Sequence, residues 1–197
     1  RWHPAQGTSS WSFTYVQHGS GPTSILVRAT DDSLNTSAPV SHSVAVSCPC
    51  SLFGSEPPAI VDSGDPNPVE LGVRVRFEAS GWVTALRFHK TIQNTGPHMG
   101  SLWTTTGALL ARGTFVDESE SGWQTLMLSA PVAVAAGTTL VASYSTPTGH
   151  YSVTAGQFVT DYSSAPLTAP AAAPEAGNGV YGMVGSFPTS RYGAPSY

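Results

Sequence analysis

The feature that most constrains the fold is a period-two alternation of apolar and polar residues over residues 69–78. In VELGVRVRFE, apolar residues occupy every second position from Val69 to Phe77, and charged residues fill most positions between them. Successive side chains of a β-strand point to opposite faces, so the pattern predicts a half-buried strand with one apolar face. A turn follows at Ser80, and Gly81–Lys90 is predicted to be the next strand.

The rest of the chain repeats this strand pattern and shows almost no helical periodicity. Short alternating runs bounded by Gly, Pro, Asn or Asp are typical of a sandwich or barrel, so the sequence predicts an all-β fold. We expect strands at Trp11–Gln17, Ser24–Thr30, Val40–Ser47, Val69–Glu78, Gly81–Lys90, Gly100–Thr105, Leu109–Phe115, Trp123–Ala130, Thr139–Ser145 and Gln157–Thr160. We expect the main core to contain Phe77, Leu86, Phe88, Trp123, Leu126, Val141 and Tyr144.

The composition indicates an extracellular protein and argues against two classes of partner. Charged residues make up only 10% of the chain, against roughly 25% in an ordinary soluble domain. The net charge is −4 and no basic stripe exists, so nucleic-acid binding is not expected. No apolar run approaches the roughly 20 residues that cross a bilayer, so no membrane span is expected either. We expect secretion to the cell surface, with a signal peptide removed.

Proline-rich segments divide the chain. The segment CPCSLFGSEPPAIVDSGDPNP begins at Cys48 and is rich in Pro, Gly, Ser and Asp, as irregular linkers are. It predicts a first unit at residues 1–47, a linker at 48–55 and a larger domain at 56–197. A second Pro-rich segment, Ala165–Ala176, is predicted to be an extended loop, because prolines cannot donate to a strand ladder.

Motifs in both parts carry family resemblances. WHPAQGTSSWSFTY, ILVRATDDSLNTSAP and SHSVAVS resemble the back half of a bacterial immunoglobulin-like repeat. VELGVRVRF, VTALRFHK, NTGPHMGSLWTTTGALLA, SGWQ, PVAVAAGTTLVASYSTPTGHYS, GNGVYG and FPTS resemble, in order, the bacterial domain of unknown function numbered 4082, found in large secreted and surface proteins. The resemblance implies a jelly-roll-like antiparallel β-sandwich, preceded by a partial Ig-like β unit. It implies no established activity.

Both resemblances are incomplete at their outer ends. The Ig-like part lacks its front strands, and the second part stops before a closing apolar strand. Sandwiches that lack strands expose unpaired edges. Two interpretations follow: the chain is a fragment of a longer polypeptide, or neighbouring copies complete each domain by strand addition. The second interpretation predicts a homo-oligomer or a filament.

Candidate ligand-binding residues lie in turn-like segments. His98 in NTGPHMG and His150 in PTGHY each occur in such a segment, where side chains can converge at one end of a sandwich. A ligand pocket lined by these two histidines with Trp103 and Tyr151 is one interpretation; loop-fixing hydrogen bonds are the other. Arg87 either reaches an acceptor inside the sandwich or is an exposed strand residue.

The sequence supports no metal site and no active site. Asp62, Asp65 and Glu70 could supply oxygen ligands to Ca²⁺, but they match no calcium loop, and turn capping explains them as well. Two histidines alone do not make a zinc site. Neither a nucleophile elbow nor a facing pair of carboxylates is recognisable, so no cofactor and no catalysis are expected.

The CPC pair is the remaining reactive feature. Cys48 and Cys50 could bind a soft metal as thiolates, but in an oxidising compartment a disulfide is the stronger interpretation. Because a ring closed two residues apart would be strained, a cross-link to another chain is a further alternative.

The sequence therefore predicts a non-catalytic extracellular module for cell-surface binding or adhesion, directed at a glycan. The alternative is a structural subunit of an extracellular fibre or sheath.

Overall fold

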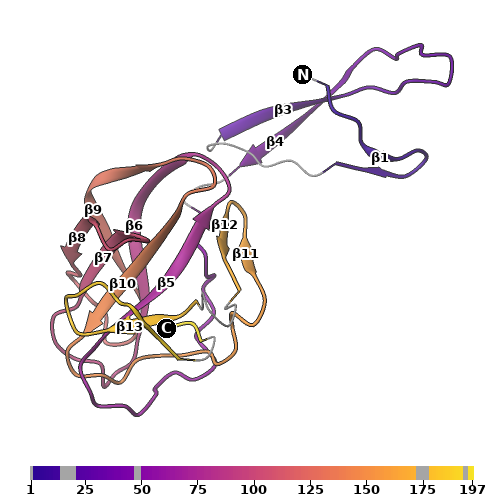
Figure 1. The fold of residues 1–197 in the computed structure, drawn as a ribbon. Helices are drawn as coiled ribbons and strands as arrows, with labels where there is room; N and C mark the ends of the chain where they lie inside the picture. The colour runs from indigo at the N-terminus through magenta and orange to yellow at the C-terminus, as the bar shows by residue number, and fades with distance from the viewer. Residues whose placement is uncertain (1, 14–20, 47–49, 172–177, 193–194) are drawn as a thin grey trace. The chain divides into compact units, whose positions relative to one another are not determined.

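The computed structural model describes residues 2–13, 21–46, 50–171, 178–192 and 195–197. The chain divides into two compact units, Arg1–Cys50 and Ser51–Tyr197. All regular structure in the described ranges is β, and every strand pairing is antiparallel, which confirms the predicted fold class (Figure 1). No helix that could span a membrane occurs among these residues.

Two strand pairs occur in the part of unit 1 that the structure describes. The strands are β1 (Gln6–Gly7), β2 (Trp11–Ser12), β3 (Gly21–Val27) and β4 (Val40–Val46). β1 pairs with β2, and β3 pairs with β4 in an unbroken register. The loop after β3 is held by Asp31, whose carboxylate accepts hydrogen bonds from the backbone N–H groups of Ser33 and Asn35. Asp31 is therefore a turn-capping residue, as acidic residues in loops often are.

The described part of unit 2 contains ten strands in two layers. The strands are β5 (Val69–Phe77), β6 (Gly81–Lys90), β7 (Met99–Thr104), β8 (Leu109–Thr114), β9 (Gly122–Val134), β10 (Thr139–Thr146), β11 (Tyr162–Ser164), β12 (Leu167–Ala169), β13 (Val180–Gly182) and β14 (Ser190–Arg191). The large sheet has the order β11-β12-β5-β10-β7-β8, and β13 pairs with both β5 and β14. β6 and β9 form the second, two-stranded sheet (Figure 1).

The main core lies between the two sheets, which gives unit 2 a sandwich-like arrangement. Its buried members are Leu71, Leu86, Phe88, Leu102, Phe115, Leu126, Val134, Leu140 and Tyr144. Phe88 is the centre of this cluster, because its ring contacts Tyr144 at 4.3 Å and Phe115 at 4.8 Å between centroids. The apolar face of β5 is buried at Leu71 and Val75 as predicted, but Glu70 and Gly72 on the opposite face are buried too, so this end of the strand is covered on both faces.

Two residues predicted for the main core lie elsewhere. Val141 is fully buried, but on the other face of the large sheet, where it packs with Trp103 and Val180. Trp123 is half-buried on the outer face of β9. The prediction places Trp123 in the same core as Leu126, but residues three apart on a regular strand face opposite sides of the sheet. Gln124, two residues before Leu126, faces the core in place of Trp123.

Two segment predictions were wrong. Gln157–Thr160 forms a turn and not a strand. The Pro-rich segment predicted as a loop includes β12, in which Leu167 pairs with Phe77 and Thr168 with Arg76 at the edge of β5. Proline is tolerated at such a position because it stands before the paired residues and withdraws no donor from the ladder.

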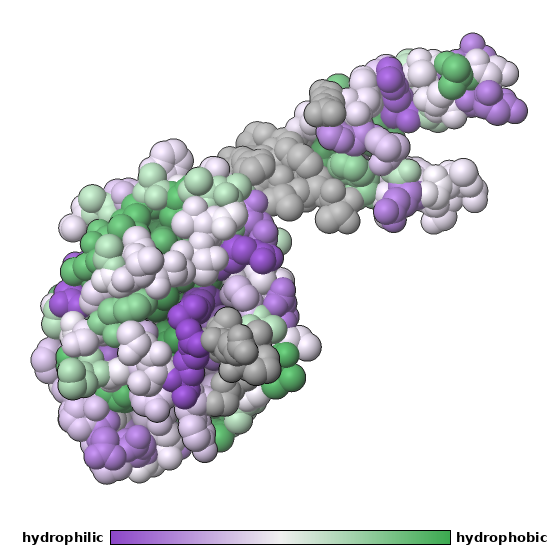
Figure 2. Space-filling view, viewed as in Figure 1, coloured by the Kyte–Doolittle hydropathy of each residue, from purple (hydrophilic) through white to green (hydrophobic). Residues whose placement is uncertain are grey.

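The surface reflects the low charge of the chain. On the face of unit 2 seen in Figure 2, a narrow band and a few smaller patches of strongly hydrophilic residues lie among weakly polar and apolar ones.

Candidate functional site: an aromatic groove

The predicted ligand residue His98 is fully buried, and both of its ring nitrogens have hydrogen-bonding partners. Its side chain is 0% exposed. Nδ1 lies 2.8 Å from the Glu118 carboxylate, Nε2 lies 2.8 Å from Oδ1 of Asn94, and the ring packs on Phe88 at 4.8 Å. Glu118 also forms an ion pair of 2.9 Å with Lys90. These contacts leave His98 no open side toward a ligand.

The orientation of the Asn94 amide bears on the protonation of His98. With Oδ1 toward the imidazole, Nδ2 of Asn94 has no partner among the described residues. The opposite amide orientation lets Nδ2 donate to Nε2 of His98 and to Oγ1 of Thr146, which itself donates to the Gly149 carbonyl at 2.6 Å. His98 is then neutral and donates its Nδ1 proton to Glu118. Burial, which lowers the pKa of His98, favours the same state.

His150 and Tyr151 hold a loop. Nδ1 of His150 lies 3.1 Å from Asp62, and its backbone N–H donates to the Asp65 carbonyl at 2.6 Å. The Tyr151 hydroxyl lies 3.5 Å from the Asp65 carboxylate. Asp62 also accepts a hydrogen bond from the Gly64 N–H. Asp62 therefore contacts the His150 ring and its own turn, and Asp65 contacts the His150 backbone and the Tyr151 hydroxyl.

Trp103 lies on the far side of the large sheet from the core. It is 6% exposed, and its indole N–H donates to Oγ of Ser143, which in turn donates to Glu70. Phe187 covers the ring edge-on at 5.7 Å. The structure thus does not gather His98, Trp103 and His150 into one pocket.

The predicted calcium and cysteine sites find no further support. Glu70 faces Ser143 and not the two aspartates. Within the described ranges, no group of three or more His, Cys, Asp or Glu side chains is placed to share a metal ion. Cys50 is half-buried, and Cys48 lies outside the described residues, so the predicted disulfide or cross-link stays a prediction.

Unit 2 contains a groove of about 270 Å³ on the outer side of the two-stranded β6–β9 sheet. Five aromatic side chains line it: Phe53, His89, Trp123, Tyr162 and Tyr197. The other lining residues are Gly54, Glu56, Pro57, Pro58, Thr154, Gln157 and Ser196. Aromatic walls with a few polar groups are the usual composition of a small-molecule site.

The floor of the groove comes from the two-stranded β6–β9 sheet. His89 on β6 and Trp123 on β9 are direct cross-strand partners, and their rings meet edge-to-face at 5.5 Å. The indole N–H of Trp123 donates to the carbonyls of Ser55 and Glu56 at 3.1 and 3.2 Å. These bonds fasten the irregular segment that forms one wall, and the Phe53 ring stacks on Trp123 at 6.2 Å.

Arg87, the fifth predicted ligand residue, is exposed on the same face of β6. Its guanidinium carbon lies 4.7 Å from the centre of the Trp123 ring, and Nη1 donates to Oγ of Ser51 at 3.0 Å. Arg87 therefore contacts the groove residue Trp123 but does not itself line the groove.

The hydrogen bonds of Ser152 determine which ring nitrogen of His89 carries the proton. It is 9% exposed, and Nδ1 lies 2.9 Å from Oγ of Ser152. The single hydroxyl proton of Ser152 goes to the Val61 carbonyl at 2.6 Å, so Nδ1 of His89 must carry a proton and donate it. Burial lowers the pKa of His89 and keeps the ring neutral.

The family of the larger unit follows from comparison with known proteins. Residues 55–197 match the model of a family described as a domain of unknown function, DUF4082. The chain belongs to the DUF4082 family. No curated protein and no solved structure matches the chain significantly.

The groove lies almost entirely within the DUF4082 match, and sequence reasoning did not find it. Tyr162, Tyr197, Phe53 and His89 were not predicted as site residues, and Trp123 was assigned to the core. One signal was available: Arg87 and His89 alternate with buried Leu86 and Phe88, which puts both on the outer face of β6.

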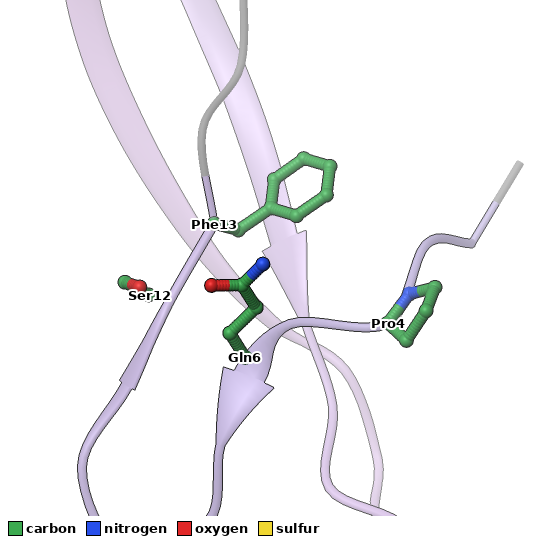
Figure 3. Close-up of a pocket in the computed structure, with 4 residues that line it drawn as sticks. All are labelled: Pro4, Gln6, Ser12 and Phe13. Carbon is green, nitrogen blue, oxygen red and sulfur yellow. The ribbon is translucent and has the colours of Figure 1, made fainter.

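A second hollow occurs in unit 1, apart from the DUF4082 domain. Pro4, Gln6, Ser12 and Phe13 enclose about 220 Å³ beside the β1–β2 pair (Figure 3). All four residues are exposed. An open surface of this kind offers a ligand little burial, so the groove of unit 2 is the candidate site.

Proposed function

We propose that the DUF4082 domain of this chain is a non-catalytic extracellular binding module that takes a carbohydrate at the cell surface in its aromatic groove. The supporting observation is the lining: aromatic side chains beside Glu56, Thr154 and Gln157. Sugars present apolar C–H faces that pack on aromatic rings and hydroxyl groups that need hydrogen-bonding partners. The groove offers both kinds of contact.

The same lining argues for binding without hydrolysis. Glycoside hydrolysis commonly requires two carboxyl groups facing each other across the scissile bond. Glu56 is the one carboxylate among the groove residues that the structure describes. We therefore expect a bound oligosaccharide to remain intact.

An oligosaccharide array followed by titration calorimetry tests the proposal. Tyr162→Ala and Gln157→Ala should each weaken binding, the first by about tenfold, because an aromatic contact contributes about 0.5–1.5 kcal/mol beyond its buried area. Tyr192→Ala is the matched control, since Tyr192 is 78% exposed and does not line the groove. Absence of binding to any oligosaccharide, or binding that Tyr162→Ala leaves unchanged, would refute the groove as a carbohydrate site.

One observation favours the alternative, a structural subunit of an extracellular fibre. β8 is an edge strand of the large sheet, and its residues Leu109 and Leu110 are exposed. An edge strand with apolar side chains can pair with a strand from another chain. Negative-stain microscopy of the purified protein would reveal filaments if this surface drives assembly, and Leu110→Lys should then dissolve them.

A further inference from the structure

His89 leaves one hydrogen-bonding position for a ligand. Because its Nδ1 proton is donated to Ser152, Nε2 carries a lone pair and can only accept. No described group hydrogen-bonds to Nε2, and His89 lines the groove. A ligand that fills the groove must therefore donate a hydrogen bond to this nitrogen or leave it unsatisfied.

The charge around His89 disfavours an anion. Glu56 is the charged side chain among the groove residues. Arg87 is a cation beside the groove but not among its lining residues; its guanidinium carbon lies 4.7 Å from the centre of the Trp123 ring, and Nη1 donates to Oγ of Ser51. A carboxylate or sulfate at His89 would face the lone pair of Nε2, and no Lys or Arg side chain is among the described residues that line the groove.

From these two observations we infer that the groove selects neutral sugars, anchored by a hydroxyl group that donates a hydrogen bond to Nε2 of His89, and rejects acidic sugars. The inference rests on the proposed function and specifies the ligand class of the same site. A hydroxyl group supplies the donor that Nε2 requires and brings no charge. A site built around one buried acceptor discriminates strongly, because a ligand without the matching donor leaves that acceptor unpaired.

Two isosteric substitutions separate the two nitrogens of His89. In His89→Asn, the amide N–H₂ lies where Nδ1 was, so the bond to Ser152 is kept and the groove acceptor is lost. In His89→Gln, the amide oxygen reaches the position of Nε2, so the groove acceptor is kept and the bond to Ser152 is lost. We expect His89→Asn to weaken binding of a neutral oligosaccharide about tenfold and His89→Gln to weaken it much less.

Acidification provides an independent readout. Protonation of Nε2 converts the acceptor into a donor, so the wild-type protein should bind a neutral sugar more weakly near pH 5 than near pH 8. The other ionisable groups at or beside the groove are Glu56, Arg87, Tyr162 and Tyr197. His89→Gln retains all four, so its binding should lose the pH dependence.

The experiment titrates gluco-, galacto- and manno-oligosaccharides, and oligogalacturonides as acidic probes, into the full chain. Nitrogen-15 NMR of the histidine rings in the wild-type protein adds a measurement that needs no variant: it should report the Nδ1–H tautomer of His89 and a shift at Nε2 on adding the neutral probe. Tight binding of oligogalacturonide, or equal binding by His89→Asn and wild type, would overturn the inference while the groove stays a carbohydrate site. Absence of binding to every probe would overturn the proposed function, and the inference with it.

Discussion

Ser143 is the position at which a small change should have a large and specific effect on unit 2. Its hydroxyl group accepts a hydrogen bond from the indole N–H of Trp103 at 2.8 Å and donates one to the Glu70 carboxylate at 2.6 Å. The other carboxylate oxygen accepts the backbone N–H of Gly185 at 3.0 Å. Ser143→Ala removes two bonds at once in a region where Trp103, Ser143 and Glu70 are all buried.

The expected cost follows from the two groups left behind. A buried N–H without an acceptor costs about 1–3 kcal/mol, and a hydrogen bond to a charged group contributes about 1.5–3 kcal/mol. Burial raises the pKa of Glu70, so uptake of a proton can relieve part of the second loss. We therefore expect Ser143→Ala to lower the free energy of unfolding by about 2–4 kcal/mol near neutral pH.

Urea unfolding followed by tryptophan fluorescence measures this change. Ser145→Ala is a graded comparison on the same face of β10, because Ser145 accepts one hydrogen bond, from the Met99 N–H at 3.0 Å, and should cost less. Ser129→Ala, at an exposed position of β9, should cost almost nothing. If Ser143→Ala were no more destabilising than Ser129→Ala, the hydrogen-bonded chain from Trp103 to Glu70 would contribute nothing to stability, and our reasoning would be wrong.

Three further perturbations have defined outcomes. Phe88→Ala should destabilise unit 2 by about 3–5 kcal/mol, because the ring is the centre of the main core; an unchanged midpoint in urea would contradict that assignment. Gly149→Ala should be strongly destabilising in a thermal melt, because Gly149 has a φ of +70° and a Cβ there would collide with the Asp65 carbonyl. Stability measured against pH should fall as the pH drops below about 6.5, because His89 and His98 are held neutral in the folded state and accept protons more readily when unfolded; a flat profile from pH 7 to 5 would rule this out.

The strands that the sequence predicts well are those with one apolar face. Gly81–Lys90 was predicted with the bounds that the structure has, and Val69–Glu78 extends one residue past β5. The short strands β11 to β14 were missed. Each has only two or three residues, too few to display a period, and their positions depend on the edge of β5 that they complete.

The candidate site was harder to predict than the fold, for a geometric reason. Its aromatic residues come from separate parts of the chain, and no motif joins them. Trp123 illustrates the ambiguity, because a tryptophan on a strand suits a core and a groove equally well until the register is known. His98 illustrates the reverse case: a histidine in a glycine-rich turn resembled a ligand, and buried partners on both ring nitrogens make it structural.

The construction of the groove separates stability from specificity. Its floor, His89 with Trp123, belongs to the two-stranded β6–β9 sheet. The inner face of this sheet packs on the main core, so changes in the floor disturb folding and binding together. One wall is an irregular segment, Gly54–Pro58, held to that floor by two hydrogen bonds from the Trp123 indole to backbone carbonyls. Since backbone carbonyls do not depend on side-chain identity, Glu56 can be replaced without loosening the wall. Substitutions in this segment can therefore alter which ligand the groove accepts while Trp123 keeps the segment in place.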